Sequence, residues 1–252
     1  ISRNLYYAND RDLFIEVTHG PHIVDNNILG SEYSFDNVAQ GGAFINNLFL
    51  GNMRKVSIMD RSTPYHYPHS TDIAGCSFVF GGDDRIYQNI FVGGSEIQAD
   101  NSFSGTKGYD GHLTSIEEYR AEAIRLGNRD HEMFFQIKDP VYINKNAYLK
   151  GAKAFEREEE NVLSEFDPQV KFDLVGEETF LEINLPEEIF EIETEIFSTH
   201  KLGMLRVVEA PFDDPNGNPI EFDKDYFGNQ RDKNAVGPFN DLKPGLNRIK
   251  VW

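Results

Sequence analysis

The sequence is poor in cysteine, in basic residues and in long apolar runs, and each shortage excludes a class of protein. Its single cysteine, Cys76, excludes an internal disulfide and a metal site built from several thiolates. No apolar run approaches the roughly eighteen residues of a membrane-spanning helix. The 252 residues carry 24 Lys and Arg against 42 Asp and Glu, so the formal net charge is 24 − 42 = −18. Phosphate backbones and anionic membranes attract clustered Lys and Arg, so this balance argues against nucleic-acid and membrane partners.

Apolar and aromatic residues are plentiful. Hydrophobic residues make up 39% of the chain, with 20 Phe and 11 Tyr, which is enough for a sizeable core. The length allows a single large domain or two small ones. The chain begins at Ile1 inside a strand-like segment, and we expect it to be the C-terminal part of a longer protein.

A short phrase recurs in the first part of the chain: Asn, then two or three apolar residues, then Gly or a small polar residue. It begins at Asn4, Asn27, Asn47, Asn89 and Asn146. The first spacings are 27 − 4 = 23, 47 − 27 = 20 and 89 − 47 = 42. The longest spacing contains a Pro- and His-rich excursion over 53–71, and without it one further coil of about 22 residues remains.

This period predicts an all-β solenoid, a parallel β-helix, because each coil must bend at fixed corners and repeat its inward-facing residues. Asn tolerates the left-handed backbone that such corners need. Asn side chains stacked coil over coil can also satisfy one another's amides, while apolar side chains stack inside. The alternative is an antiparallel sandwich whose turns happen to contain Asn.

The remainder of the chain follows a different pattern. The segment TSIEE at 114–118 predicts a capping box and a short helix that ends near Leu126, with Gly127 as its C-cap. Short strands with acidic turns over 170–209 predict an antiparallel appendage. We therefore expect coils over 1–151, with loop insertions at 52–73 and 100–130, and a cap with a wrapping tail over 152–252.

Two carboxylates fall at equivalent positions of adjacent coils. Counting back eleven residues from Asn27 gives Glu16, and from Asn47 gives Asp36. Adjacent coils lie about 4.8 Å apart, so the two side chains should stack. Two carboxyl groups about 5–5.5 Å apart have the geometry of a retaining glycosidase. Glu16 follows an apolar run, where a carboxylate needs a function or a partner, whereas Asp36 could simply cap a turn.

Further polar residues gather in three loops. Four of the seven histidines are His19, His22, His66 and His69. They could bind sugar hydroxyls, make structural hydrogen bonds, or bind zinc or iron, for which HxxH spacing on loops is a weak signal. The segment GGDDR at 81–85 offers Asp83, Asp84 and Arg85. An ion pair would engage one Asp and leave the other for a ligand, whereas Ca²⁺ binding is the competing interpretation.

Several of these motifs, in this order, resemble family 120 glycoside hydrolases, which are β-xylosidases built on a right-handed parallel β-helix. The resemblance is carried by SRNL (2–5), DLFIEVTHGP (12–21), VDNN (24–27), PYH (64–66), PHST (68–71), GGDDR (81–85), DYFG (225–228) and GPF (237–239). It covers most of residues 1–100 and the tail, while 130–210 adds little.

The resemblance implies that Glu16 is the general acid/base. The family's nucleophile is an Asp one coil upstream, a position before Ile1, so an N-terminal segment or chain must complete the β-helix. It also implies an oligosaccharide substrate and no cofactor, and a homo-oligomer remains open. The residues expected to line the sugar pocket are His19, His22, Asp36, His66, His69, Asp83, Asp84 and Arg85.

Two other functions compete with xyloside hydrolysis. A β-helix polysaccharide lyase would need basic residues for polyuronates and often Ca²⁺, and the acidic composition argues against it. A non-catalytic carbohydrate-binding solenoid would bind without turnover. The sugar itself rests on the resemblance, and arabinose or galactose stay open alongside xylose.

Overall fold

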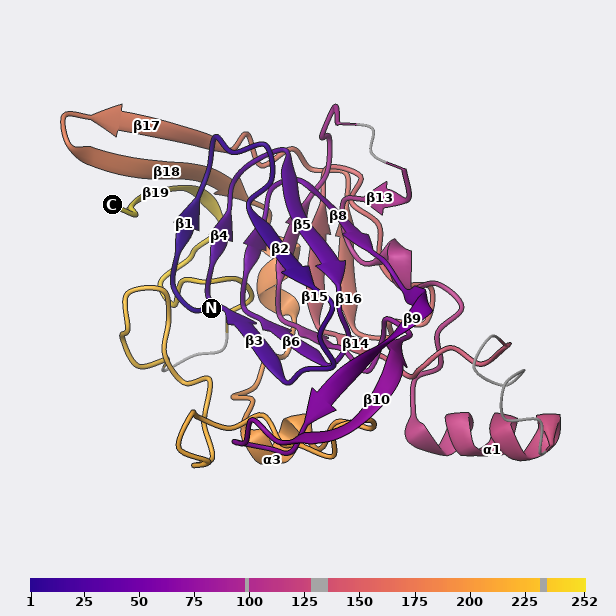
Figure 1. Ribbon diagram of the computed structural model, residues 1–252. Coiled ribbons are helices and arrows are strands. Elements are labelled where there is room, and N and C mark those ends of the chain that lie inside the picture. The colour runs from indigo at the N-terminus through magenta and orange to yellow at the C-terminus, as the bar shows by residue number, and fades with distance from the viewer. Residues whose placement is uncertain (98–99, 128–135, 232–234) are drawn as a thin grey trace.

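Three sheets of mostly parallel strands form the framework of the protein in the computed structural model, which describes residues 1–97, 100–127, 136–231 and 235–252 (Figure 1). Sheet A contains β3 (His22–Asp25), β6 (Gly42–Ile45), β11 (Arg85–Tyr87) and β14 (Tyr142–Asn144). Sheet B contains β1 (Leu5–Tyr6), β4 (Ile28–Leu29), β7 (Leu48–Phe49), β12 (Ile90–Val92), β15 (Asn146–Leu149) and β16 (Asn161–Ser164). Sheet C contains β2 (Leu13–Glu16), β5 (Tyr33–Val38), β8 (Asn52–Lys55) and, antiparallel to it, β13 (Ser102–Phe103).

The chain visits the three sheets in a repeated order. β2, β3 and β4 lie in sheets C, A and B, and β5, β6 and β7 pair with them in parallel. The next strands, β8, β11 and β12, again fall in sheets C, A and B. The predicted all-β fold with parallel sheets is therefore present.

The predicted Asn ladder is confirmed. Asn4, Asn27, Asn47 and Asn89 each donate from the backbone N and from Nδ2 to the Oδ1 of the next repeat Asn, at 2.8–3.1 Å. Asn146 donates in the same way to Glu158 Oε1, which ends the ladder. The left-handed corner is the residue before the ladder Asn, as at Asn26 (φ 53), Asn46 (φ 56) and Gln88 (φ 58).

Asn47→Ala should destabilise the protein by about 3–5 kcal/mol, because it leaves the buried Asn27 backbone N–H without an acceptor and removes the side-chain donor to the Val24 carbonyl and Asn89 Oδ1. Asn4→Ala is the matched control at the open end of the ladder, where about 1 kcal/mol is expected. Chemical denaturation of both variants measures the difference. Equal losses would show that the ladder does not act as a buried network.

Aromatic rings stack inside the sheets, as predicted for inward-facing positions. Phe49 and Phe91 lie 4.8 Å apart and nearly parallel, and Phe91 and Tyr148 follow at 5.2 Å. These positions are in register across β7, β12 and β15. Aligned rings on successive strands of sheet B thus stack in the interior.

The insertions differ in detail from the prediction. Residues 52–55 are the coil strand β8, and the excursion is an antiparallel hairpin of β9 (Ile58–His66) and β10 (Ile73–Val79) instead of a loop. Its β-branched and aromatic residues favour strands. The second insertion holds η1 (Lys107–Tyr109) and the predicted helix, α1 (Ile116–Leu126), which Ser115 caps by accepting from Glu118 N. Residues 128–130 of that insertion lie outside the described residues.

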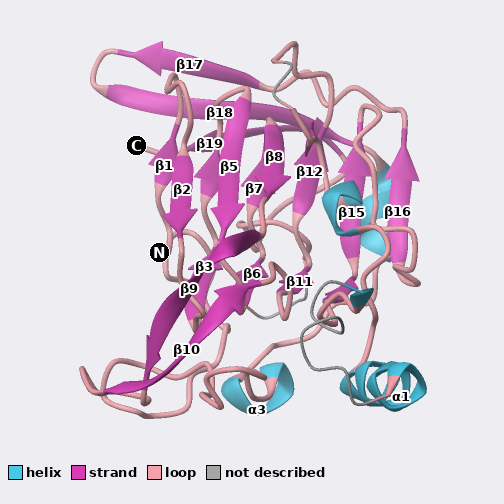
Figure 2. Cartoon of the chain, turned by 45° about the vertical axis from the view of Figure 1, so that its right-hand side comes forward, coloured by secondary structure: helices cyan, strands magenta, loops and turns pink. Residues whose placement is uncertain are grey.

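The C-terminal part packs on the framework, and its antiparallel sheet covers the outer face of sheet B. β17 (Lys171–Val175), β18 (Glu178–Leu185) and β19 (Gly245–Lys250) form an antiparallel sheet. Alternate residues of β18 pack on the outer side of sheet B, because both faces are apolar. Between them lie η2 (Glu187–Glu191) and α3 (Thr199–Leu202), and Figure 2 shows α3 at the same end as the β9–β10 hairpin. In the described part of the chain, no helix is long and apolar enough to cross a membrane.

Candidate active site

Glu16 lies at the end of β2 on the outer face of sheet C. Along β2, Leu13 and Ile15 pack against the core, while Phe14 and Glu16 are exposed. β2 is an outer strand of sheet C, with β5 as its neighbour. The next residue, Val17, has φ 38, and a β-branched residue in the left-handed region is a strained conformation.

The predicted stacking of Glu16 on Asp36 is wrong. Glu16 pairs with Val38, and Asp36 pairs with Phe14. The first coil runs 27 − 16 = 11 residues from Glu16 to its ladder Asn, whereas the second runs 47 − 38 = 9 from Val38. The corner between β2 and β3 is thus two residues longer than the corner between β5 and β6. Counting back eleven residues from each ladder Asn therefore misaligned the two strands by two residues.

Asp36 is fully buried on the outer side of sheet C, and its carboxylate is occupied by hydrogen bonds from other side chains of the protein. Its carboxylate accepts hydrogen bonds from Arg11 at 2.6 Å, Arg54 at 2.8 Å and the Tyr33 hydroxyl at 2.5 Å. Burial alone would raise the pKa of Asp36, but these three hydrogen bonds outweigh it and keep the pKa below its usual value. Asp36 is therefore a constant anion that orients two arginines beside β2. Sequence reasoning missed both arginines, because nothing local links them to Asp36.

Of the four histidines predicted to line the sugar pocket, His66 and His69 lie on the β9–β10 hairpin or its loop, His19 contacts that hairpin, and His22 points into the interior. His19 is buried, with Nε2 3.1 Å from the Thr63 carbonyl and Nδ1 3.0 Å from Gln40, and it fixes the hairpin to the first coil. Burial lowers the pKa of His19, which keeps it neutral. On the hairpin side, His66 is exposed and His69 lies 3.0 Å from Asp213 of the tail. Of these, only His19 follows β2 directly in the chain.

His22 points into the interior of the coils, away from the outer face that carries Glu16. Its ring lies 5.7 Å from Phe44, and neither ring nitrogen has a hydrogen-bond partner in the described part of the chain. Burial lowers the pKa of His22 to about 4. His22 is therefore a neutral imidazole packed in the interior.

Asp83, Asp84 and Arg85 alternate between the two sides of sheet A. The expected ion pair is present, with Arg85 Nη1 2.6 Å from Asp83 Oδ1. Arg85 also donates to the Leu202 and Met204 carbonyls, and Asp83 accepts from the backbone of Arg206. Both side chains therefore clamp the segment after α3 onto the framework.

Asp84 points the other way, into a buried polar cluster that sequence reasoning did not find. The cluster comprises Asn37, Lys55, Asp84, Tyr109 and His112. Asp84 accepts from Gly42 N at 2.7 Å, Asn37 Nδ2 at 3.0 Å and the Tyr109 hydroxyl at 2.7 Å. Lys55 Nζ lies 2.8 Å from His112 Nε2. These residues come from four separate segments, so no local pattern announces them.

Burial dominates the ionisation of this cluster. It raises the pKa of Asp84 to about 7, against the hydrogen bonds from Gly42 and Tyr109 that lower it. It lowers the pKa of Lys55 to about 8, and it lowers that of His112 to about 3 with help from the neighbouring Lys55 charge. Groups that titrate near neutral pH can transfer protons, but the cluster faces the interior and not the face of Glu16.

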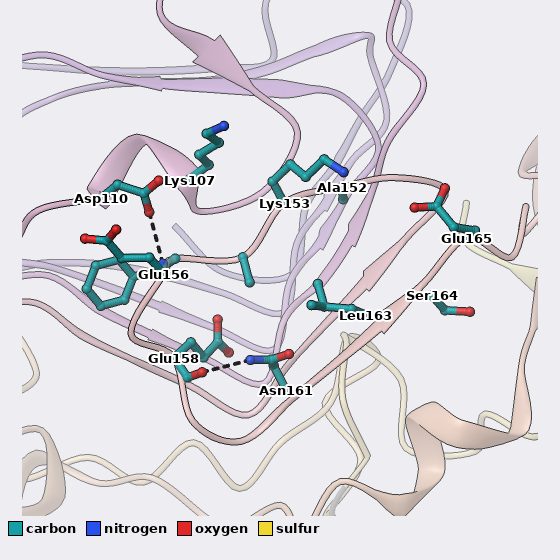
Figure 3. Close-up of a pocket in the computed structure, with 12 residues that line it drawn as sticks. Lys107, Asp110, Ala152, Lys153, Glu156, Glu158, Asn161, Leu163, Ser164 and Glu165 are labelled. Carbon is teal, nitrogen blue, oxygen red and sulfur yellow. Dashed lines mark hydrogen bonds between the residues drawn. The ribbon is translucent and has the colours of Figure 1, made fainter.

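A cavity of about 470 Å³ lies beside β16, at the end of the framework opposite β1, and carboxylate side chains line it (Figure 3). Glu158 accepts from the ladder at Asn146 and from the Tyr148 hydroxyl at 2.5 Å. Asp110 accepts from the backbone of Glu156 at 3.0 Å. These carboxylates close the last coil, so we assign them a structural role. Over the described ranges, no group of three or more His, Cys, Asp or Glu residues is arranged to hold a metal ion.

The comparisons with known proteins give one informative result. No family model and no curated protein matches the chain. The chain is similar to a solved structure, the complex structure of XylC with xylose, with a TM-score of 0.93 and 46% sequence identity. The match covers 100% of this chain and 39% of that chain, so the protein spans about two fifths of the length of XylC.

Proposed function

We propose that the chain is the C-terminal part of a retaining glycoside hydrolase that releases terminal xylose from xylo-oligosaccharides. The observation that carries the proposal is the match of this whole chain to 39% of XylC, whose structure holds xylose, at 46% identity and a TM-score of 0.93. At that level of similarity the same backbone presents many of the same side chains. The resemblance to family 120 glycoside hydrolases supports the same conclusion from separate motifs.

The proposed architecture is a right-handed parallel β-helix that continues upstream of Ile1. In support, β1, β2 and β3 are each an edge strand of their sheet, so a preceding coil could pair with all three. Asn4 donates to Asn27, while none of the described residues donates to Asn4 Oδ1. A preceding coil could supply that donor pair and place a strand about 4.8 Å from β2.

The proposed mechanism needs a second carboxylate beside Glu16, and the preceding coil is its place. An Asp on that coil would attack the anomeric carbon of xylose while Glu16 donates its proton to the leaving oxygen. The glycosidic bond breaks and a covalent xylosyl–Asp ester forms. Glu16, now ionised, then removes a proton from water, and the resulting hydroxide displaces the Asp carboxylate to release xylose with its configuration retained.

The outer face of sheet C suits this role. Phe14 lies two residues before Glu16 on the same face and is 42% exposed, so it offers an apolar surface to a pyranose ring. The Arg11 guanidinium lies 4.1 Å over the Phe14 ring and also binds Asp36, which fixes the side chains next to Glu16.

The test is the stereochemistry of hydrolysis by the protein that includes the preceding coil. Proton NMR of an aryl β-xyloside digest should show β-xylose as the first sugar product, before mutarotation. Initial release of α-xylose would contradict retention. An unsaturated product that absorbs in the ultraviolet would indicate a lyase, and binding without any product would indicate a non-catalytic solenoid; either overturns the proposal.

A further inference from the structure

A second cavity, of about 700 Å³, opens on the outer face of sheet A, and we call it the sheet A cavity. Tyr87 of β11 and Tyr142 of β14 contribute to its lining, with Asn144 beside them. Residues 156–160 and Glu195 are also among its lining residues. The cavity lies at the opposite end of the framework from Glu16. β14 is the edge strand of sheet A farthest from β3, and Glu16 is on β2, the strand that precedes β3 in the chain.

The ring of Tyr142 is oriented and open on one side. The guanidinium of Arg85, on the neighbouring strand, lies 4.6 Å from its centroid. β14 is an outer strand of sheet A, so no strand of that sheet lies beyond the ring. Tyr142 is also only half-buried. A fixed aromatic ring with an open face is suited to stacking against the C–H groups of a pyranose.

Three hydrogen-bonding groups in the cavity are unused. The hydroxyls of Tyr87 and Tyr142 and Nδ2 of Asn144 have no partner among the residues that the structure describes, although Asn144 Oδ1 accepts from Glu160 N at 2.7 Å. Phe197 stacks on Tyr87 at 4.2 Å and holds its ring in place. Burial raises the pKa of Tyr87 to about 12, so its hydroxyl stays a donor at neutral pH.

Carboxylates outnumber cations in the lining, and this excess disfavours anionic ligands. The carboxylates belong to Glu156, Glu158, Glu159, Glu160 and Glu195, and the cations to Lys145 and Arg157. Lys145 Nζ lies 3.5 Å from Glu160 and 3.3 Å from Glu195. Arg157 donates to both carboxylate oxygens of Glu118, at 3.0 and 2.7 Å. Neither cation is left over for an anion, and the protein as a whole carries a charge of −18. Hydroxyl-rich, uncharged molecules fit this environment.

We propose that the sheet A cavity is a second carbohydrate-binding site, separate from the active site, that holds a neutral oligosaccharide. Tyr142 stacks on one sugar ring, while the Tyr87 hydroxyl and Asn144 Nδ2 bind sugar hydroxyls. The choice of a xylo-oligosaccharide as ligand rests on the proposed function. A site of this kind would keep a long substrate on the enzyme between cleavage events.

The test is calorimetric titration of xylohexaose into the protein carrying Glu16→Gln, so that binding is measured without hydrolysis. Tyr142→Ala should weaken the second site about tenfold or more, and Tyr87→Phe about three- to fivefold. Tyr142→Phe, which keeps the ring, should stay within about threefold of the parent. Tyr67→Ala, an exposed tyrosine on the loop between β9 and β10, is the control and should change nothing.

The outcomes separate this proposal from the proposed function. Binding of xylohexaose that Tyr142→Ala leaves unchanged at every site, or a Tyr142→Phe variant that loses as much affinity as Tyr142→Ala, would overturn the second site. With Glu16 intact, Tyr142→Ala should leave kcat/KM for an aryl xyloside unchanged; a loss there would also overturn it, by placing Tyr142 in catalysis. Binding at Tyr142 without any hydrolysis would reject the hydrolase and keep the second site.

Discussion

Glu16→Gln should lower kcat/KM for xylobiose by about 10²–10⁴-fold in the protein that includes the preceding coil. Gln preserves the size and hydrogen bonding of the side chain at the end of β2 but cannot deliver a proton to the leaving oxygen. A nitrophenyl xyloside leaves as a stable anion and needs little protonation, so its bond-breaking step should suffer far less. Steady-state kinetics on the two substrates measure the contrast, and equal losses on both would count against the acid role.

Two controls make this prediction specific to Glu16. Glu32→Gln changes another exposed glutamate of the first coils and should leave both substrates unaffected. Glu16→Ala should regain turnover of the aryl xyloside when azide is added, because azide needs no general base to attack the xylosyl intermediate. The product expected is the β-xylosyl azide. No rescue, or an α-azide, would show that Glu16 does not serve the second step of a retaining mechanism.

The periodic features of the fold could be predicted from sequence, because each coil repeats them. The Asn ladder and the Phe49–Phe91 stack follow from the spacing of one short phrase. The register of the polar residues could not be predicted, since the corners vary in length. Glu16 to His22 spans 22 − 16 = 6 residues, but their partners Val38 and Gly42 span 42 − 38 = 4.

The surroundings of the site residues were harder to predict than their identity. Asp83, Asp84 and Arg85 stood out as a motif, and an ion pair between Arg85 and one of the two aspartates could be predicted from their closeness in sequence. The partners of Asp84 did not follow. Asn37 and Tyr109 reach it through the packing of distant coils, and Asp36 acquires Arg11 and Arg54 in the same way. Long-range contacts of this kind leave no local sequence signal.

Asp84 should make the protein less stable as the pH rises from about 4 to about 7. The carboxyl holds its proton to a pKa of about 7 when folded, against an ordinary value of 3.8, so in this window the folded state binds more protons than the unfolded state. Stability therefore falls with rising pH, by at most about 4 kcal/mol from this group. Lys55 has the opposite effect at higher pH: its folded pKa of about 8 lies below 10.5, so stability should recover from about pH 8 to about 10.5.

Urea denaturation of the parent and of Asp84→Asn at a series of pH values isolates the contribution of this carboxyl. Asn keeps one acceptor oxygen, which can serve Gly42 N, but places an NH2 group where Asp84 Oδ2 accepts from the Tyr109 hydroxyl and Asn37 Nδ2. This costs stability at every pH. Because Asn cannot ionise, the difference in unfolding free energy between the two proteins should still shift in favour of the variant between pH 4 and 7. Asp60→Asn, at an exposed position of the β9–β10 hairpin, should show no such shift. A parent-minus-variant difference that stays flat over this window would mean that Asp84 ionises at an ordinary pKa, so that the hydrogen bonds from Gly42 N and the Tyr109 hydroxyl fully offset the cost of burying its charge.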